Sequence, residues 1–208
     1  MRVLPREHGA TVIWLSSLII ALATLDEAPS VIGLAAFVTA SVAALVLLAK
    51  LTGGSAAVMR IERNIVLLPI LSGLLTLIVP LGHVLMLGQL SKSILAVWFL
   101  FLTYTVAGVV YTRIAVRAVL GRTKSSLATC MIPVSFILVA EVAVLSAIGW
   151  LHSAAAIIVG PSLFWWLAIT SLSESEASSR TGIVRRVGIM QSANMIAVSI
   201  ILAVVSRL

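Results

Sequence analysis

Long runs of apolar residues, separated by short polar breaks, occupy most of this 208-residue chain. The hydrocarbon core of a bilayer is about 30 Å thick and needs about 20 apolar residues per helix. Backbone groups in lipid must satisfy one another, and these runs lack the polar alternation of a barrel strand, so we expect helices. With 61% hydrophobic and only 10% charged residues, the composition lies outside the range of ordinary soluble domains.

Seven such runs predict one all-α domain over residues 1–208, a polytopic membrane helix bundle. The predicted spans are roughly 10–25, 30–50, 65–86, 93–112, 126–148, 151–171 and 188–206, uncertain by a few residues at each end. Arg2 and Arg6 before the first run also fit a signal peptide, although Glu7 and His8 interrupt the approach to it. Cleavage there would leave six spans.

The basic residues separate by side when these spans are threaded through a membrane. One side carries 12 of the 14 Lys and Arg residues, and the other carries only Lys92 and Arg207. The positive-inside rule then predicts a cytoplasmic N-terminus in the cell membrane. The net charge of +7 does not indicate nucleic acid, because these residues are spread over membrane-proximal turns where we expect contact with lipid headgroups.

Acidic residues are too few for several classes of membrane enzyme. Asp26 is the only aspartate, so the carboxylate clusters that hold Mg²⁺ on a diphosphate are not available, nor is an aspartate pair for intramembrane proteolysis. Glu141 is the only acid deep within a predicted span. Such residues normally face a bundle interior. Glu141 is therefore expected either to handle protons or ligands, or to be a neutral side chain hydrogen-bonded to a neighbouring helix.

Histidines and small residues leave further alternatives open. His83 and His152 end the third and sixth spans, and they would suit a haem if the two spans were neighbours; otherwise they are helix-end polar residues. No metal-ligand set is predicted, and the cofactor is unknown. Small residues recur at the four-residue spacing that lets helices pack closely in lipid, namely Ala36, Ala40 and Ala44, and Ala156 with Gly160.

A basic stretch follows the fourth span. If that helix continues beyond the membrane surface, Arg113 and Arg117 share one face, close to Tyr111. Two guanidinium groups one turn apart can bind a phosphate or carboxylate, or they can anchor the chain to lipid headgroups.

Three segments resemble the YwiC-like family of small multi-pass membrane proteins. They are Pro5-Arg6-Glu7-His8-Gly9-Ala10, Gly108-Val109-Val110-Tyr111-Thr112-Arg113 with Arg117, and Arg186-Val187-Gly188. The chain differs from the family pattern at Thr11 and Gln191. The resemblance implies a multi-pass fold and brings no established activity.

All three segments fall on the predicted cytoplasmic side, where we expect them to form one polar pocket. The candidate ligand-binding residues are Arg6, Glu7, His8, Tyr111, Arg113, Arg117, Arg186, Gln191 and Asn194. The expected function is binding of an anionic or amphipathic ligand, or of a membrane partner subunit. The alternatives are an enzyme that uses His8 and Glu7 on a lipid-like substrate and a small proton-coupled transporter that uses Glu141.

Overall fold

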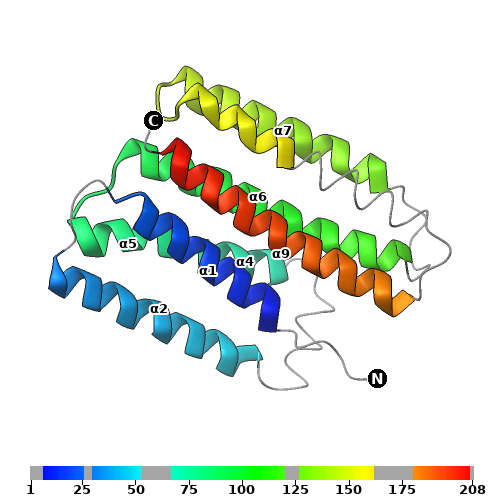
Figure 1. The fold of residues 1–208 in the computed structure, drawn as a ribbon, viewed down its shortest axis with the longest axis horizontal. Coiled ribbons are helices and arrows are strands. Elements are labelled where there is room, and N and C mark those ends of the chain that lie inside the picture. The colour runs from blue at the N-terminus through cyan, green and yellow to red at the C-terminus, as the bar shows by residue number, and fades with distance from the viewer. Residues whose placement is uncertain (1–6, 26–29, 53–66, 120–126, 162–179, 207–208) are drawn as a thin grey trace.

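The computed structural model describes residues 7–25, 30–52, 67–119, 127–161 and 180–206, with side chains described for 11–25, 30–43, 70, 72–113, 136–161 and 186–206. These residues form an all-helical bundle (Figure 1). Its helices are α1 Glu7–Ala23, α2 Val31–Thr52, α4 Leu67–Thr76, α5 Ile78–Leu87, α6 Lys92–Val119, α7 Leu127–Ala147, the 3-10 helix η1 Ser153–Ile158, and α9 Arg180–Val205. The predicted fold class, all-α, is confirmed.

The helices lie roughly side by side in layers (Figure 1). Helix α2 packs on α5 at one side of the bundle, and α7 packs on α6 at the other. Between them α1 contacts α9, α5 and α4, while α6 contacts α9 and α4. This arrangement makes α6 and α9 the centre of the bundle.

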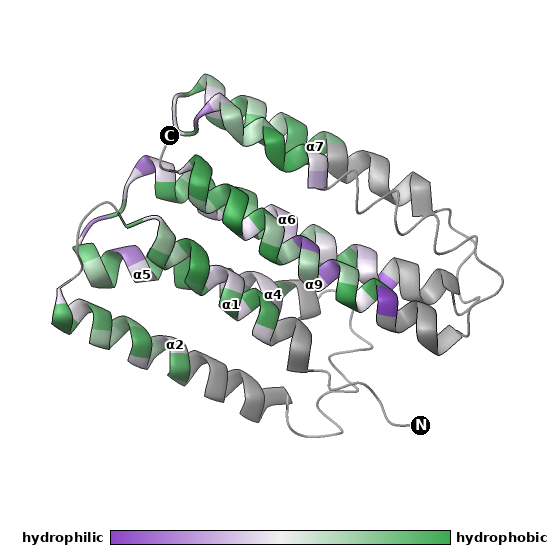
Figure 2. Cartoon of the chain, viewed as in Figure 1, coloured by the Kyte–Doolittle hydropathy of each residue, from purple (hydrophilic) through white to green (hydrophobic). Residues whose placement is uncertain are grey.

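Two stretches of helix are long and apolar enough to cross a membrane, namely Lys92–Arg113 and Arg186–Val205. Shorter apolar stretches are Thr11–Ala23, Val31–Ala43, Ser72–Leu87 and Phe136–Ala147. Apolar residues predominate along the described helices (Figure 2), and many large ones are exposed as well as buried. The sixth predicted span, 151–171, is described only as far as residue 161. This part contains η1, which His152 caps by accepting a hydrogen bond from Ala154 N to Nδ1 at 3.3 Å.

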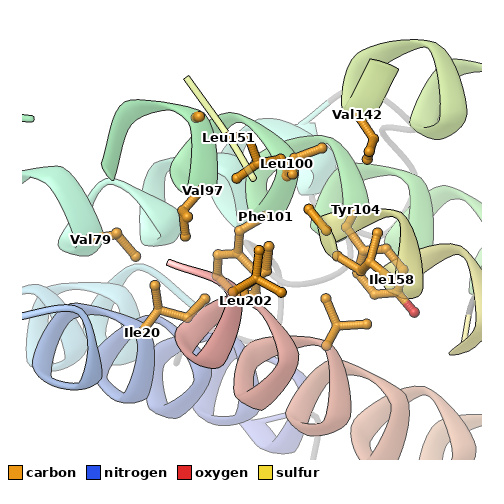
Figure 3. Close-up of a cluster of buried hydrophobic side chains, with 14 of the residues drawn as sticks. Ile20, Val79, Val97, Leu100, Phe101, Tyr104, Val142, Leu151, Ile158 and Leu202 are labelled. Carbon is orange, nitrogen blue, oxygen red and sulfur yellow. The ribbon is translucent and has the colours of Figure 1, made fainter. Parts of the chain in front are cut away.

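The core gathers around one face of α6. Ala96, Val97, Leu100 and Phe101 have no exposed surface. Figure 3 shows Phe101 close to Leu202 of α9, with Ile20 of α1 and Val79 of α5 in the same cluster. In water, burying each large apolar side chain contributes about 1.5–3 kcal/mol. In lipid, the close packing of the same side chains holds the helices together. The cluster therefore determines which helices are neighbours.

A break divides the third predicted span into α4 and α5. Helix α4 ends at Thr76, four residues before Pro80. A proline has no N–H to donate to the carbonyl four residues earlier, and its ring clashes with that carbonyl. The end of α4 is bound to α6 by a hydrogen bond, which Trp98 Nε1 donates to Thr76 Oγ1 at 3.1 Å.

Close helix approach occurs at glycines and not at the predicted alanines. Of the predicted small-residue stripes, Ala36, Ala40, Ala156 and Gly160 are exposed and make no close helix contact within the described chain, while the side chain of Ala44 lies outside the described residues. Gly33 faces α5 instead, and a Cβ atom built there would lie 2.5 Å from Leu85 O. Helix α2 is apolar on every side, so spacing alone could not identify its inward face.

Candidate functional site

The described helices place most basic residues at one end of the bundle. This end, called the basic end below, is where α1, α4, α7 and α9 begin and where α2 and α6 finish (Figure 1). The basic residues on described helix there are Lys50, Arg113, Arg117, Arg180, Arg185 and Arg186. Lys92 is the one at the opposite end of a described helix. The charge asymmetry inferred from the sequence is therefore also an asymmetry of the folded bundle.

Helix α6 extends past the predicted span to Val119, so Arg113 and Arg117 lie on one continuous helix. At 1.5 Å per residue its 28 residues span about 42 Å, more than the thickness of a hydrocarbon core. The condition under which Arg113 and Arg117 share one face is therefore met. Arg113 is half-buried, and the side chain of Arg117 lies outside the described residues.

A polar cluster lies between α6 and α9, about two to four turns from the basic end. Tyr104, Gly108 and Tyr111 follow one another at i, i+4 and i+7, and therefore share the face of α6 that meets α9. Asn194 Nδ2 donates a hydrogen bond to the Tyr104 hydroxyl. Tyr104 is 3% exposed, within the core shown in Figure 3, and Tyr111 is 2% exposed.

Gln191 fits against Gly108 in this cluster. A Cβ atom at position 108 would lie 2.1 Å from Gln191 Nε2, so only glycine leaves room for the carboxamide in this position. Gln191 Oε1 is buried and has no hydrogen-bond partner among the described residues. Thr105 Oγ1, on the next residue after Tyr104, is also buried without a partner there. A buried acceptor left unpaired costs about 1–3 kcal/mol. We call Tyr104, Thr105, Gly108, Gln191 and Asn194 the α6–α9 polar cluster.

The structure brings together only part of the predicted pocket. Gln191 and Asn194 meet α6, and Tyr111 is buried on the same face, whereas Arg186 is exposed. Glu7 and His8 form the first turn of α1, which packs on α9, but their side chains and all of Arg6 lie outside the described residues. Sequence reasoning missed Tyr104 and Thr105, although the i, i+4, i+7 spacing of Tyr104, Gly108 and Tyr111 was available to it.

Glu141 lies apart from this cluster, between α7 and α6. Its Oε1 accepts a hydrogen bond from Thr103 Oγ1 at 3.2 Å, which agrees with the expected bond to a neighbouring helix. Its Oε2 is buried and has no partner among the described residues. Thr103 and Tyr104 are adjacent on α6 but point to different helices, so the two polar sites are distinct.

The two histidines of the haem alternative have different surroundings. His83 of α5 is 3% exposed, and its Nε2 lies 2.6 Å from Thr24 Oγ1 of α1. Thr24 Oγ1 also lies 2.7 Å from Ile20 O, to which it donates, so it accepts from an Nε2–H of His83. His152 is exposed at the start of η1. The two imidazoles therefore do not share a site, and the described residues contain no group of three or more His, Cys, Asp or Glu suited to a metal ion.

These features define an all-helical bundle with membrane-capable central helices and a polar cluster between them. Comparisons with protein-family models, with curated proteins and with solved structures find no match. The function is therefore argued from the residues of the two polar sites and from the charge of the basic end.

Proposed function

We propose that this chain is a multi-pass membrane protein with the basic end in the cytoplasm. Two membrane-capable helices support this, together with the four shorter apolar stretches beside them. Large apolar side chains on the outer helices are strongly exposed, including Val31 and Ile32 of α2 and Phe136 of α7 at 85%, 83% and 72%. Exposed apolar surface on this scale is typical of contact with lipid. The concentration of Lys and Arg at one end favours the cytoplasmic side for that end, and hence for the N-terminus.

We further propose that the α6–α9 polar cluster binds the headgroup of an amphipathic ligand. The observation that carries the proposal is the buried, unpaired Gln191 Oε1 beside Gly108. Because Oε1 is an acceptor, the ligand must present a hydroxyl or N–H donor. Polar groups between membrane helices are costly unless they are paired, which is why they often mark binding sites.

Basic residues next to the cluster indicate that the ligand is negatively charged. Tyr111 and Arg113 lie three and five residues beyond the cluster on α6, toward the basic end, and Arg113 is half-buried. A guanidinium group there favours a phosphate or carboxylate. The ligand is therefore an anionic lipid or lipid-like molecule whose headgroup also carries a hydrogen-bond donor.

The resemblance to the YwiC-like family is part of this proposal. Gly108, Tyr111 and Arg113 of the second resembling segment occupy the stretch of α6 next to the cluster, and the third segment leads into Gln191 on α9. An enzymatic role for Glu7 and His8 depends on side chains outside the described residues. Binding is therefore the function that the described geometry supports best.

The mass of the intact protein tests binding directly. Released from its membrane in mild detergent, the chain is expected to retain one reproducible extra mass on its 21.9 kDa. Ligands held by buried polar contacts survive mild release, whereas surrounding lipids give a broad, concentration-dependent distribution of adducts. A bare chain, or only that broad distribution, would contradict the proposal.

A further inference from the structure

Glu141 lies at the edge of the contact between α7 and α6. The residues of α7 that pack toward α6 are Leu138, Val142 and Leu145, which are 3%, 5% and 8% exposed. One turn to either side of Glu141, Ile137 and Val144 are 53% and 58% exposed. The acid therefore lies on the boundary between the helix contact and the outer, apolar surface of α7.

The carboxyl group has one satisfied and one unsatisfied oxygen. Thr103 donates to Oε1, and Oε2 is buried without a hydrogen-bond partner among the described residues. A carboxylate has room for several donors, so one hydroxyl leaves most of its capacity unused. Oε2 is itself buried, but the Glu141 side chain as a whole is only half-buried, so a small turn of the carboxyl group toward the exposed surface of α7 brings this oxygen within reach of a molecule there.

The described side chains near Glu141 supply no positive charge to this carboxyl. On α6 the nearest basic residues are Lys92 and Arg113, eleven and ten residues from Thr103, or about 15 Å along the helix axis. The described part of α7 and η1 has no Lys or Arg, and its one histidine, His152, is exposed beyond the end of α7. Among the described side chains, therefore, none supplies a cation that pairs with Glu141.

We propose that Glu141 and Thr103 form a second binding site, which takes the ammonium group of an amphipathic amine from the lipid side. An ammonium group offers three donors, one of which can bond to Oε2, the oxygen without a partner among the described residues, and leave Oε1 bonded to Thr103. Charged groups within a membrane are normally paired with one another, and a charge-assisted bond is about twice as strong as a neutral one. The apolar tail lies along the exposed residues Ile137 and Val144. The site shares the membrane setting of the proposed function but does not depend on the α6–α9 polar cluster.

The test compares dodecylamine with dodecanol, which has the same tail and a neutral donor, on the full chain in mild detergent. Native mass spectrometry is expected to show one dodecylamine bound to the wild type, with affinity about tenfold lower in Glu141→Gln. Gln keeps the size of the side chain and an oxygen for Thr103 but cannot carry charge. Dodecanol is expected to bind both proteins equally and weakly.

A second pair of variants separates binding from folding. Thr103→Ser keeps the hydroxyl and is expected to bind dodecylamine like the wild type, whereas Thr103→Val is expected to bind it about fivefold less tightly. Equal dodecylamine affinity in the wild type and a folded Glu141→Gln would overturn the proposal. So would dodecanol binding as tight as that of the amine. Neither result would bear on the proposed binding of an anionic ligand at the α6–α9 polar cluster.

Discussion

Replacing Gln191 with methionine is expected to abolish the protein's preference between two anionic lipids that differ only in hydrogen-bond donors. Phosphatidylglycerol and phosphatidylmethanol carry the same charge, and with matched acyl chains only the glycerol headgroup has free hydroxyls. In the wild type a hydroxyl reaches Gln191 Oε1, which is otherwise buried and unpaired among the described residues. One such bond contributes about 1 kcal/mol, so phosphatidylglycerol is expected to bind about fivefold more tightly.

Methionine is chosen because it keeps the length of glutamine beside Gly108 while removing the acceptor. The ratio of the two affinities, measured by lipid titration with native mass spectrometry, is expected to fall to about one. Gly188→Ala is the matched control, because it lies one turn away on α9 with no atom within 4 Å of the added Cβ. If the ratio of affinities were already near one in the wild type, Gln191 would not bind the headgroup hydroxyl, and the proposed role of Gln191 would be contradicted.

Gly33→Ala is expected to lower the free energy of unfolding. Gly33 is the described glycine at which an added methyl group would meet backbone atoms of another helix. The added Cβ would lie 2.5 Å from Leu85 O and 3.0 Å from Met86 Cα, and neither backbone atom can move without shifting α5. Overpacking of this kind costs about 1–3 kcal/mol. At Gly108, in contrast, the clash is with the flexible end of Gln191, so a methyl group there displaces the carboxamide more readily than the helix.

Unfolding in mixed micelles measures this effect, with Gly188→Ala again as the control. An alanine in an open helical position is expected to stabilise the helix by about 0.5–1 kcal/mol relative to glycine. The two alanine variants should therefore shift the free energy of unfolding in opposite directions. Equal free energies of unfolding for Gly33→Ala and Gly188→Ala would contradict the close contact of α2 with α5.

Much of the helical framework was predictable because it depends on composition along the chain. The apolar runs located α1, α2, α6, α7 and α9 to within a few residues at most ends. The exceptions are the end of α6, at Val119 instead of 112, and the start of α9, at Arg180 instead of 188. The break before Pro80 follows from the chemistry of proline. The continuation of α6 through Arg117 was only the condition on which Arg113 and Arg117 were expected to share a face.

The contacts between helices were not predictable from local pattern. Thr103 and Glu141 are 38 residues apart, and Tyr104 and Asn194 are 90 apart. When a helix is apolar on every side, its sequence does not say which residues face a neighbour and which face outward. That is why Gln191 and Asn194 were identified as candidates while their partners Gly108 and Tyr104 were not joined to them, and why Ala36 was mistaken for a contact residue.

Labelling of single cysteines from either side of the membrane tests the central claim, a multi-pass bundle with its basic end in the cytoplasm. In a Cys130→Ser background, cysteine is placed at the exposed positions Ser93, Ser153 and Arg186, one per variant. An impermeant maleimide is expected to label positions 93 and 153 in intact cells, and position 186 only after permeabilisation. Labelling of position 186 in intact cells, or protection of positions 93 and 153, would contradict the proposed topology and with it the cytoplasmic placement of the polar cluster.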